Sequence, residues 1–228
     1  MIVNGRTQAR VDEALKKLNG GRKVEGLAAD LGTAAGALQA IERFPEVDIL
    51  VNNLGIFEAK PFPDITDQDW MRFFEVNVLS GVRLSRHYLP GMKLRNWGRI
   101  VFISSESAVQ IPAEMIHYGM TKTAQVAVAR GLAETTSGTN VTVNTVLPGP
   151  TASEGVTGFL DQMAAKEQTD KATIEREFFT SVRPSSLLKR FATPEEVAEL
   201  VAFVCSPLSS ATNGAALRAD GGVVRAIL

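Results

Sequence analysis

Short apolar runs of strand length alternate along the chain with longer segments in which apolar residues recur at helical spacing. The apolar runs are continuous, which is typical of strands covered by helices on both faces. Strand and helix patterns alternate throughout, so the sequence predicts an α/β protein with a three-layer, doubly wound parallel sheet of the Rossmann-like type. The expected strands cover 1–3, 23–31, 47–53, 98–105, 140–149 and 215–222, and the expected helices cover 9–18, 34–44, 65–89, 117–136 and 193–205.

Polar residues mark the start of two of these helices. Thr66 precedes Asp69 by three residues, and Thr193 precedes Glu196 by three, with Pro194 directly after the threonine. A threonine followed three residues later by an acidic residue can form a capping box, and proline is favoured at the first helical position. The sequence therefore predicts helix starts at these two threonines.

One segment interrupts the alternation, because the more than forty residues between Gly149 and Thr193 carry no strand pattern. A connection of this length in a compact domain is usually a lid or binding loop with helices of its own. We therefore expect a single domain over 1–228 with a substrate lid at about 150–192. Three phenylalanines of this segment either line an apolar substrate pocket or form the core of its own helices: Phe159, Phe178 and Phe179.

Composition narrows the classes of function. Of 228 residues, 45% are hydrophobic and 21% charged, and the formal net charge is −1. This balance is ordinary for a globular protein and gives no sign of nucleic-acid binding, and no apolar run approaches the roughly 18 residues of a membrane span. The single cysteine, Cys205, fits a reducing compartment and lies in an apolar run, where a buried inert thiol is expected. We therefore expect a cytoplasmic protein with no membrane partner. No metal site is expected, since His87 and His117 have no cysteine or carboxylate cluster around them.

The residues best suited to acid–base chemistry are Tyr118 and Lys122. They lie four apart on an expected helix and so share a face. A phenol has a reference pKa near 10, and a neighbouring ammonium lowers it by favouring the phenolate. The same spacing is common on solvated helix faces, so the pair alone decides nothing.

Polar and turn residues elsewhere add weight to this pair, because each lies where a doubly wound sheet places its ligand. Ser105 ends the strand over 98–105, and Asn77 lies inside the helix over 65–89. Asn52–Gly55 and Pro148–Gly149 end two further strands. Each alone also fits an ordinary role as a turn or a solvated residue, but together and in this order they indicate a catalytic site.

The set of Asn77, Ser105 and Tyr118-x-x-x-Lys122 resembles the classical short-chain dehydrogenase/reductase family. The resemblance implies an oxidoreductase that transfers a hydride between a nicotinamide cofactor and a carbonyl or secondary alcohol. It implies that Tyr118 is the general acid or base and that Ser105 orients the substrate oxygen. Lys122 would bind the nicotinamide ribose and lower the pKa of Tyr118, and Asn77 would hold a water that links Lys122 to solvent.

The same resemblance assigns the cofactor contacts. Arginine at the end of the second family strand accommodates a 2′-phosphate, whereas an acidic residue there favours the free hydroxyl. Arg6 holds this place and no acidic residue precedes Asp12, so NADP is expected over NAD; a solvent-facing arginine at a helix start is the alternative. Asp30 and Leu31 would flank the adenine. The full set of expected cofactor-binding residues is Arg6, Asp30, Leu31, Asn53, Gly55, Tyr118, Lys122, Pro148, Gly149, Thr151 and Ser153.

The beginning of the chain departs from the family pattern. The family starts with a strand, a glycine-rich T-G-x-x-x-G-x-G turn and a helix whose N-terminus receives the pyrophosphate. No such turn occurs in this sequence, and 1–3 corresponds to the second family strand. The first strand lies mid-sheet in the doubly wound order, so either 1–3 pairs directly with 47–51 or an open edge remains.

This departure leaves three cases open and predicts weak dinucleotide binding. The chain is an incomplete version of an ordinary enzyme, or a non-catalytic remnant that acts by oligomerisation or binding, or a protein whose gap is filled by a second subunit. Family members form homodimers or homotetramers, which the resemblance implies here as well.

Overall fold

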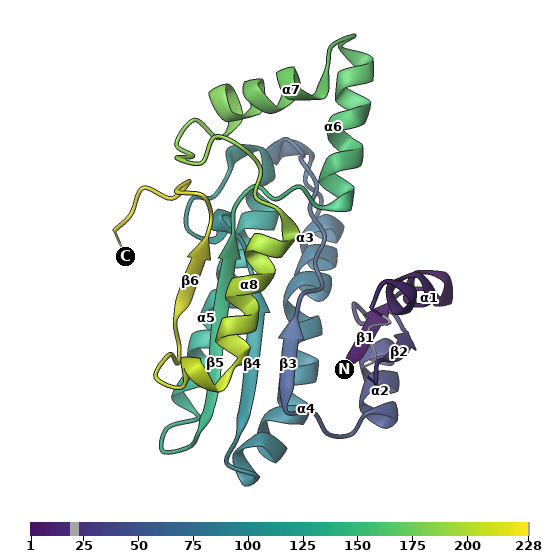
Figure 1. The fold of residues 1–228 in the computed structure, drawn as a ribbon, viewed down its shortest axis with the longest axis vertical. Helices are drawn as coiled ribbons and strands as arrows, with labels where there is room; N and C mark the ends of the chain where they lie inside the picture. Colours follow the sequence, from purple (N-terminus) through teal and green to yellow (C-terminus); the bar gives the residue numbers. More distant parts are fainter. Residues whose placement is uncertain (19–22, 228) are drawn as a thin grey trace.

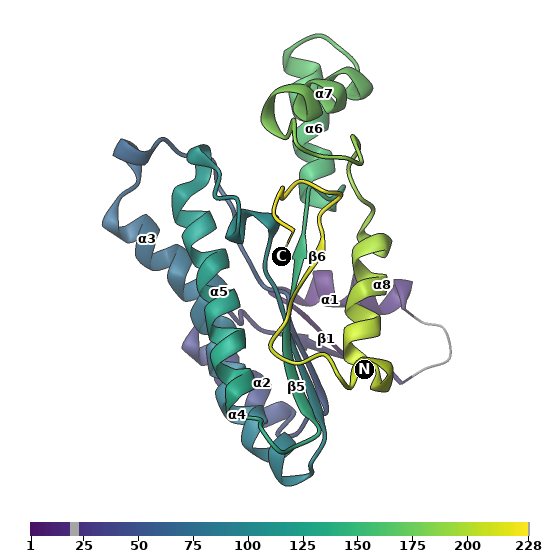
Figure 2. The ribbon, with the colours of Figure 1, turned by 90° about the vertical axis from the view of Figure 1, so that its left-hand side faces the viewer.

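A computed structural model describes residues 1–18 and 23–227, the side chains of 159 and 162 excepted. The strands are β1 (Ile2–Gly5), β2 (Glu25–Ala28), β3 (Ile49–Asn52), β4 (Gly98–Ile103), β5 (Val141–Pro148) and β6 (Ala216–Ala219). The α-helices are α1 (Gln8–Lys17), α2 (Ala34–Arg43), α3 (Asp67–Phe74), α4 (Ser80–Leu94), α5 (Ile116–Glu134), α6 (Glu154–Lys166), α7 (Lys171–Glu177) and α8 (Pro194–Cys205). The parallel strands form a middle layer, with α2, α4 and α5 on one face and α1 and α8 on the other (Figure 1, Figure 2). The expected α/β, Rossmann-like fold is confirmed.

Register explains why the strands are continuous apolar runs. β3, β4, β5 and β6 pair in that order. Leu50 lies opposite Ile100, which lies opposite Val143, and these side chains enter the core beneath α4 and α5. Val101 and Val146 belong instead to the core beneath α8. Successive residues of a strand thus supply opposite cores, as the alternation of side chains across a strand requires.

A groove of about 970 Å³ separates this four-stranded sheet from the pair formed by β1 and β2. β1 lines one side and β3 the other, and within the described chain no strand pairs with the facing edge of either. Ile49 and Val51 remain 44% and 41% exposed at this edge. The open edge is therefore the arrangement observed, and the alternative of direct pairing between 1–3 and 47–51 is wrong.

The pair β1–β2 is held by its helices, because two strands alone are marginally stable in water. α1 packs directly on β2: a Cβ added to Gly26 would lie 2.3 Å from a methyl of Val11. On the opposite face, Ala37 and Ala40 of α2 join the main core. Both helices thus stabilise the two-stranded pair.

Both helix starts expected from threonines are confirmed. Thr66 accepts a hydrogen bond from the backbone N–H of Asp69, and the Asp69 side chain accepts one from the N–H of Thr66. Thr193 and Glu196 form the same capping box, with Pro194 as the first helical residue. The sequence signals for both ends are local, which is why they survive in the folded protein.

The 150–192 segment carries α6, α7 and a π-helical turn, η5 (Phe178–Val182), and it projects beyond the end of the sheet (Figure 1). Phe178, Phe179 and Phe191 stack on one another with ring centroids 5.0–5.1 Å apart. They form a core with apolar side chains of α6 and α7. Of the two roles open for Phe178 and Phe179, the core of the segment itself is the one observed; the Phe159 side chain lies outside the described residues.

His117 on α5 is fully buried against α3. Its ring centroid lies 4.0 Å from that of Phe73 and 6.0 Å from that of Trp70. Neither ring nitrogen has a hydrogen-bond partner among the described residues. Burial disfavours the imidazolium and holds the pKa of His117 below its ordinary value of 6.5.

We predict that acid destabilises the fold through His117. The unfolded chain takes up a proton at this residue near pH 6.5, whereas the folded chain resists protonation until a lower pH. The free energy of unfolding should therefore fall below that pH, by at most about 1.4 kcal/mol per pH unit from this group. Urea denaturation on both sides of this pH measures the effect. His117→Phe should remove this contribution, while the matched change His87→Phe, on the exposed face of α4, should retain it. Equal acid sensitivity in both variants would assign the effect to other groups.

Candidate functional site

The residues expected to carry the chemistry meet where β4 ends. Ser105 lies two residues beyond β4 and is buried. The hydroxyl of Ser104 donates to the backbone carbonyl of Lys122 at 2.8 Å, which fastens α5 to the end of the strand. One helical turn before Lys122, Tyr118 lies beside Ser105, whose hydroxyl lowers the pKa of the Tyr118 phenol. The structure thus brings Ser105, Tyr118 and Lys122 together.

Burial dominates the electrostatics of this group. It raises the pKa of Tyr118 to about 12, and the nearby hydroxyl of Ser105 offsets part of the rise. It also lowers the pKa of Lys122 to about 8. The Lys122 ammonium lies 5.6 Å from the centre of the Tyr118 ring and donates to the carbonyl of Ile103 at 3.0 Å. Lys122 is not among the groups that shift the pKa of Tyr118, so the expected lowering by Lys122 is not observed; burial raises this pKa because low polarity penalises the charged form.

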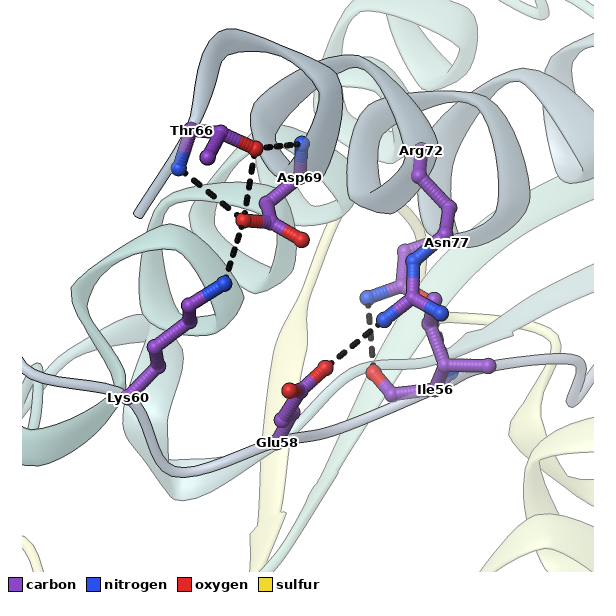
Figure 3. Close-up of polar contacts among 7 residues, drawn as sticks. All are labelled: Ile56, Glu58, Lys60, Thr66, Asp69, Arg72 and Asn77. Carbon is purple, nitrogen blue, oxygen red and sulfur yellow. Dashed lines mark hydrogen bonds and ion pairs between the residues drawn. The ribbon is translucent and has the colours of Figure 1, made fainter. Parts of the chain in front are cut away.

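Asn77 joins the loop after β3 to α5. It lies on η2 (Glu75–Leu79), a π-helical turn that divides the helix expected over 65–89, and it is fully buried. Its side-chain oxygen accepts the N–H of Ile56 at 2.8 Å, and its amide donates to the carbonyl of Ile56 at 3.0 Å (Figure 3). The amide also donates to the hydroxyl of Thr121 at 2.9 Å. π-Helical turns are rare and often occur at functional sites. Here the turn places the Asn77 amide between the loop after β3 and α5.

Two ion pairs hold the same loop beside α3 (Figure 3). Lys60 lies 2.7 Å from the Asp69 carboxylate, and Arg72 lies 2.7 Å from Glu58. Hydrogen bonds from Lys60 and from the start of α3 hold the pKa of Asp69 well below its ordinary range. Together with the bonds of Asn77, these contacts fix the loop that borders Lys122.

Two glycines allow close approach of neighbouring groups where a cofactor is expected. A Cβ on Gly55 would lie 3.3 Å from Lys122 Nζ and 3.6 Å from Asn77 Oδ1. The two polar atoms therefore border one space beside this glycine. A Cβ on Gly149 would lie 2.5 Å from the carbonyl oxygen of Asp220. Only glycine thus allows the end of β5 to pack against the turn that follows β6.

The other residues expected at the nicotinamide end continue from Gly149. Pro148 is the last residue of β5. Thr151 donates through its hydroxyl to the Gly149 carbonyl at 2.9 Å, and Ser153 precedes α6 as its N-cap. These residues lie at the same edge of the sheet as Ser105, because β4 and β5 are paired neighbours.

The residues expected at the adenosine end lie around the groove between the two sheets. Leu31 and Asn53 line it, one from the side of β2 and the other from the end of β3. The Asp30 carboxylate accepts the N–H of Gly32 at 3.0 Å, and Arg6 is exposed directly after β1. Leu31 and Asn53 are thus brought to one cavity, while Arg6 and Asp30 stand at the ends of their strands.

The sequence did not indicate two ion pairs at this edge. Arg183 of the 150–192 segment binds Glu106 at 3.0 Å, and Arg10 of α1 binds Glu154, the first residue of α6, at 2.7 Å. The partners are 77 and 144 residues apart, so no local spacing rule applies to them. The one available signal was the position of Glu106 directly after Ser105.

Three other features predicted from the sequence can be compared with the described residues: metal-binding groups, membrane-spanning helices and the single cysteine. Residues 1–18 and 23–227 contain no group of three or more His, Cys, Asp or Glu side chains placed to hold a metal ion. Over the same residues, no helix has both the length and the apolar character needed to cross a membrane. Cys205 is half-buried rather than fully buried as expected, and burial raises the pKa of its thiol.

Several known proteins are similar to this chain along nearly its whole length. The family model described as enoyl-(acyl carrier protein) reductase matches residues 2–224. Uncharacterized oxidoreductase YvrD of Bacillus subtilis is 48% identical over 230 residues, covering 100% of this chain and 88% of that protein. Dehydrogenase/reductase SDR family member 4 of Caenorhabditis elegans is 31% identical, covering 98% of this chain and 85% of that protein. The crystal structure of L-sorbose reductase from Gluconobacter frateurii, complexed with NADPH and L-sorbose, has a TM-score of 0.91 at 28% identity and covers 99% of this chain and 87% of that one.

Replacing Asn77 by leucine should lower the free energy of unfolding even when no ligand is bound. The change keeps the side-chain size but leaves the part-buried N–H and carbonyl of Ile56 unpaired, at a cost of up to about 1–3 kcal/mol for each group. Urea denaturation measures the loss. Asn53→Leu is the matched control at an exposed position and should change stability by less than about 0.5 kcal/mol. Equal losses in the two variants would mean that the Asn77 hydrogen bonds contribute no more than a surface amide.

Proposed function

Because the chain belongs to the classical short-chain dehydrogenase/reductase family of NAD(P)-dependent oxidoreductases, we propose that it interconverts a small carbonyl compound and a secondary alcohol, with NADP(H) as the preferred cofactor and NAD(H) as the alternative. The observation that carries the proposal is the meeting of Ser105, Tyr118 and Lys122 at the end of β4. This arrangement supports the roles that the family resemblance implies.

Tyr118 is assigned the proton transfer. In reduction its phenol donates a proton to the carbonyl oxygen, and in oxidation its phenolate accepts one from the alcohol. Ser105, which lies beside Tyr118, would orient the substrate oxygen at the same point. A pKa of about 12 keeps the phenol protonated and ready to donate at neutral pH. The bound cofactor supplies or receives the hydride.

Lys122 and Asn77 would exchange that proton with solvent. Because burial lowers the pKa of Lys122 to about 8, its ammonium releases a proton more readily than an exposed lysine does. Lys122 Nζ and Asn77 Oδ1 border the space beside Gly55, where a water could link them. The NH2 group of Asn77 donates to Ile56 and Thr121, and its side-chain oxygen accepts the N–H of Ile56, so a water would use the remaining lone pair of that oxygen.

The cofactor fits this site in part. Arg6 offers a guanidinium for a 2′-phosphate, Leu31 and Asn53 border the groove, and Thr151 and Ser153 lie at the nicotinamide end. Among the described residues, no glycine-rich turn opens a helix to receive the pyrophosphate. The groove between the two sheets favours a second candidate function, that of a non-catalytic member that acts by oligomerisation or binding. Assembly as a homodimer or homotetramer stays a prediction, which light scattering would check.

Tyr118→Phe should lower turnover by about 100-fold or more, because the ring remains while the proton donor is lost. The assay follows NADPH oxidation with a panel of small ketones and aldehydes. Tyr88→Phe removes the same hydroxyl from α4, where it donates to the Phe44 carbonyl, and should leave turnover close to that of the unchanged protein. Undiminished turnover in Tyr118→Phe would remove this phenol from the mechanism.

Arg6→Asp should weaken NADPH binding by about 10- to 100-fold and NADH binding far less, because only NADPH carries the phosphate that this guanidinium would pair with. Calorimetric titration with both cofactors measures the difference. Lys16→Asp makes the same charge change in the last turn of α1 and should not discriminate between them. Equal weakening by Arg6→Asp would show that Arg6 does not read the phosphate. Absence of binding to the unchanged chain would support the second candidate function.

A further inference from the structure

An ion pair joins the 150–192 segment to the residue that follows Ser105. Arg183, at the end of η5, donates from Nε to Glu106 Oε1 at 3.0 Å, and the two side chains are only 11% and 5% exposed. From Nη1, Arg183 also donates to Glu114 at 3.1 Å and to the Val182 carbonyl at 3.0 Å. One guanidinium therefore ties this segment to two carboxylates that lie between β4 and α5.

The negative charge of the buried Glu106 carboxylate is compensated by the Arg183 guanidinium. Its second oxygen, Oε2, is buried without a hydrogen-bond partner among the described residues. A buried carboxylate is costly unless it is paired, and removing one partner of a buried pair leaves an uncompensated charge. If Arg183 moved away with its segment, an unpaired anion would remain beside Ser105.

The charged groups that face Tyr118 come from three elements. Lys122 lies on α5 itself, Glu106 on the turn after β4, and Arg183 at the end of η5. From the loop after β3 the neighbour is the ring of Phe57, at 6.5 Å between centroids, which carries no charge. Burial is the largest influence on the pKa of Tyr118, followed by the nearby hydroxyl of Ser105, which lowers it. Glu106 then raises this pKa and Arg183 lowers it.

We propose that Arg183 and Glu106 are positioning residues that hold the 150–192 segment against the catalytic edge and balance the charge around the Tyr118 hydroxyl. The inference rests on the proposed function of Tyr118 in proton transfer. With the pair intact, the guanidinium offsets the carboxylate and the phenolate is tolerated. With Arg183 withdrawn, the carboxylate alone opposes the phenolate, and Tyr118 accepts a proton from an alcohol less readily. Placement of the segment and proton transfer are thereby coupled.

Tyrosinate absorbance tests the charge balance without substrate or cofactor. The chain has two tyrosines, so a Tyr88→Phe background leaves Tyr118 as the only phenol. In that background Glu106→Gln should lower the apparent pKa of Tyr118, Arg183→Met should raise it, and the double variant should return close to the background value. Glu114→Gln is the matched control, since it removes the more exposed carboxylate on Arg183 and should leave the titration unchanged.

A purely structural role predicts a different pattern. Loosened packing would hydrate Tyr118, and both single variants would then move its pKa down toward the ordinary value of about 10. Shifts in the same direction, or no shift in either variant, would overturn the inference. Arg183→Lys keeps the charge and serves if Arg183→Met does not fold. A lowered pKa in Glu106→Gln with little change in Arg183→Lys would then support the inference, and an unchanged or raised pKa in Glu106→Gln would overturn it.

Kinetics provides the second readout, with an alcohol that the unchanged protein oxidises. At neutral pH, kcat/KM should fall by about tenfold or more in Arg183→Met, and the rising limb of its pH profile should move to higher pH, while Glu106→Gln moves that limb to lower pH. Opposite tyrosinate shifts without any NAD(P)H-linked turnover would contradict the proposed function alone. Turnover that depends on Tyr118 together with tyrosinate shifts in the same direction would contradict this inference alone.

Discussion

The parallel pairing of β3, β4, β5 and β6 is the constraint on which the site depends. Because the four strands run the same way, the residues that follow them meet at one edge although the chain separates them widely. The backbone pairing of β4 with β5 continues one residue past the end of β4, where the N–H of Ser104 donates to the Val146 carbonyl at 2.8 Å. The hydroxyl of Ser104 then fastens α5 through the carbonyl of Lys122. Tyr118 and Ser105 meet as a consequence of main-chain geometry.

Two cationic side chains show that the same loss of contact with water leads to different chemistry in arginine and in lysine. Arg99 is bound by the carbonyls of Gly98 and Asn140, and Lys122 by the carbonyl of Ile103. Burial lowers the pKa of both groups, but that of Lys122 comes to about 8. An arginine starts from so high a value that it stays charged, whereas a lysine becomes able to exchange its proton. The first is suited to a structural role and the second to a site that moves protons.

Local signals in the sequence were sufficient for most of the architecture. Continuous apolar runs identified the strands because each strand supplies two cores, and Thr66 and Thr193 marked their helix starts because capping involves only the next turn. The Tyr118–Lys122 pair was equally visible, since helical spacing fixes it. The balance between burial and charge at Tyr118 was not, because it depends on what covers the residue. The Glu106–Arg183 pair likewise arises only when the 150–192 segment folds back on the end of β4.

Across the groove the two sheets share no backbone hydrogen bond among the described residues, so the pair β1–β2 is linked to the rest mainly through the packing of α2 on α4. Cooperative opening of a region follows from the contacts that it shares with its surroundings. We therefore expect the β1–α1–β2 unit to open by itself while the four-stranded sheet stays closed, once the exposed Arg10–Glu154 ion pair is broken. Amide hydrogens on the two sides of the groove should then exchange with solvent at different rates. The amide hydrogens of Arg6 and Asp30 would exchange faster, and those of Ser105 and Tyr118 more slowly.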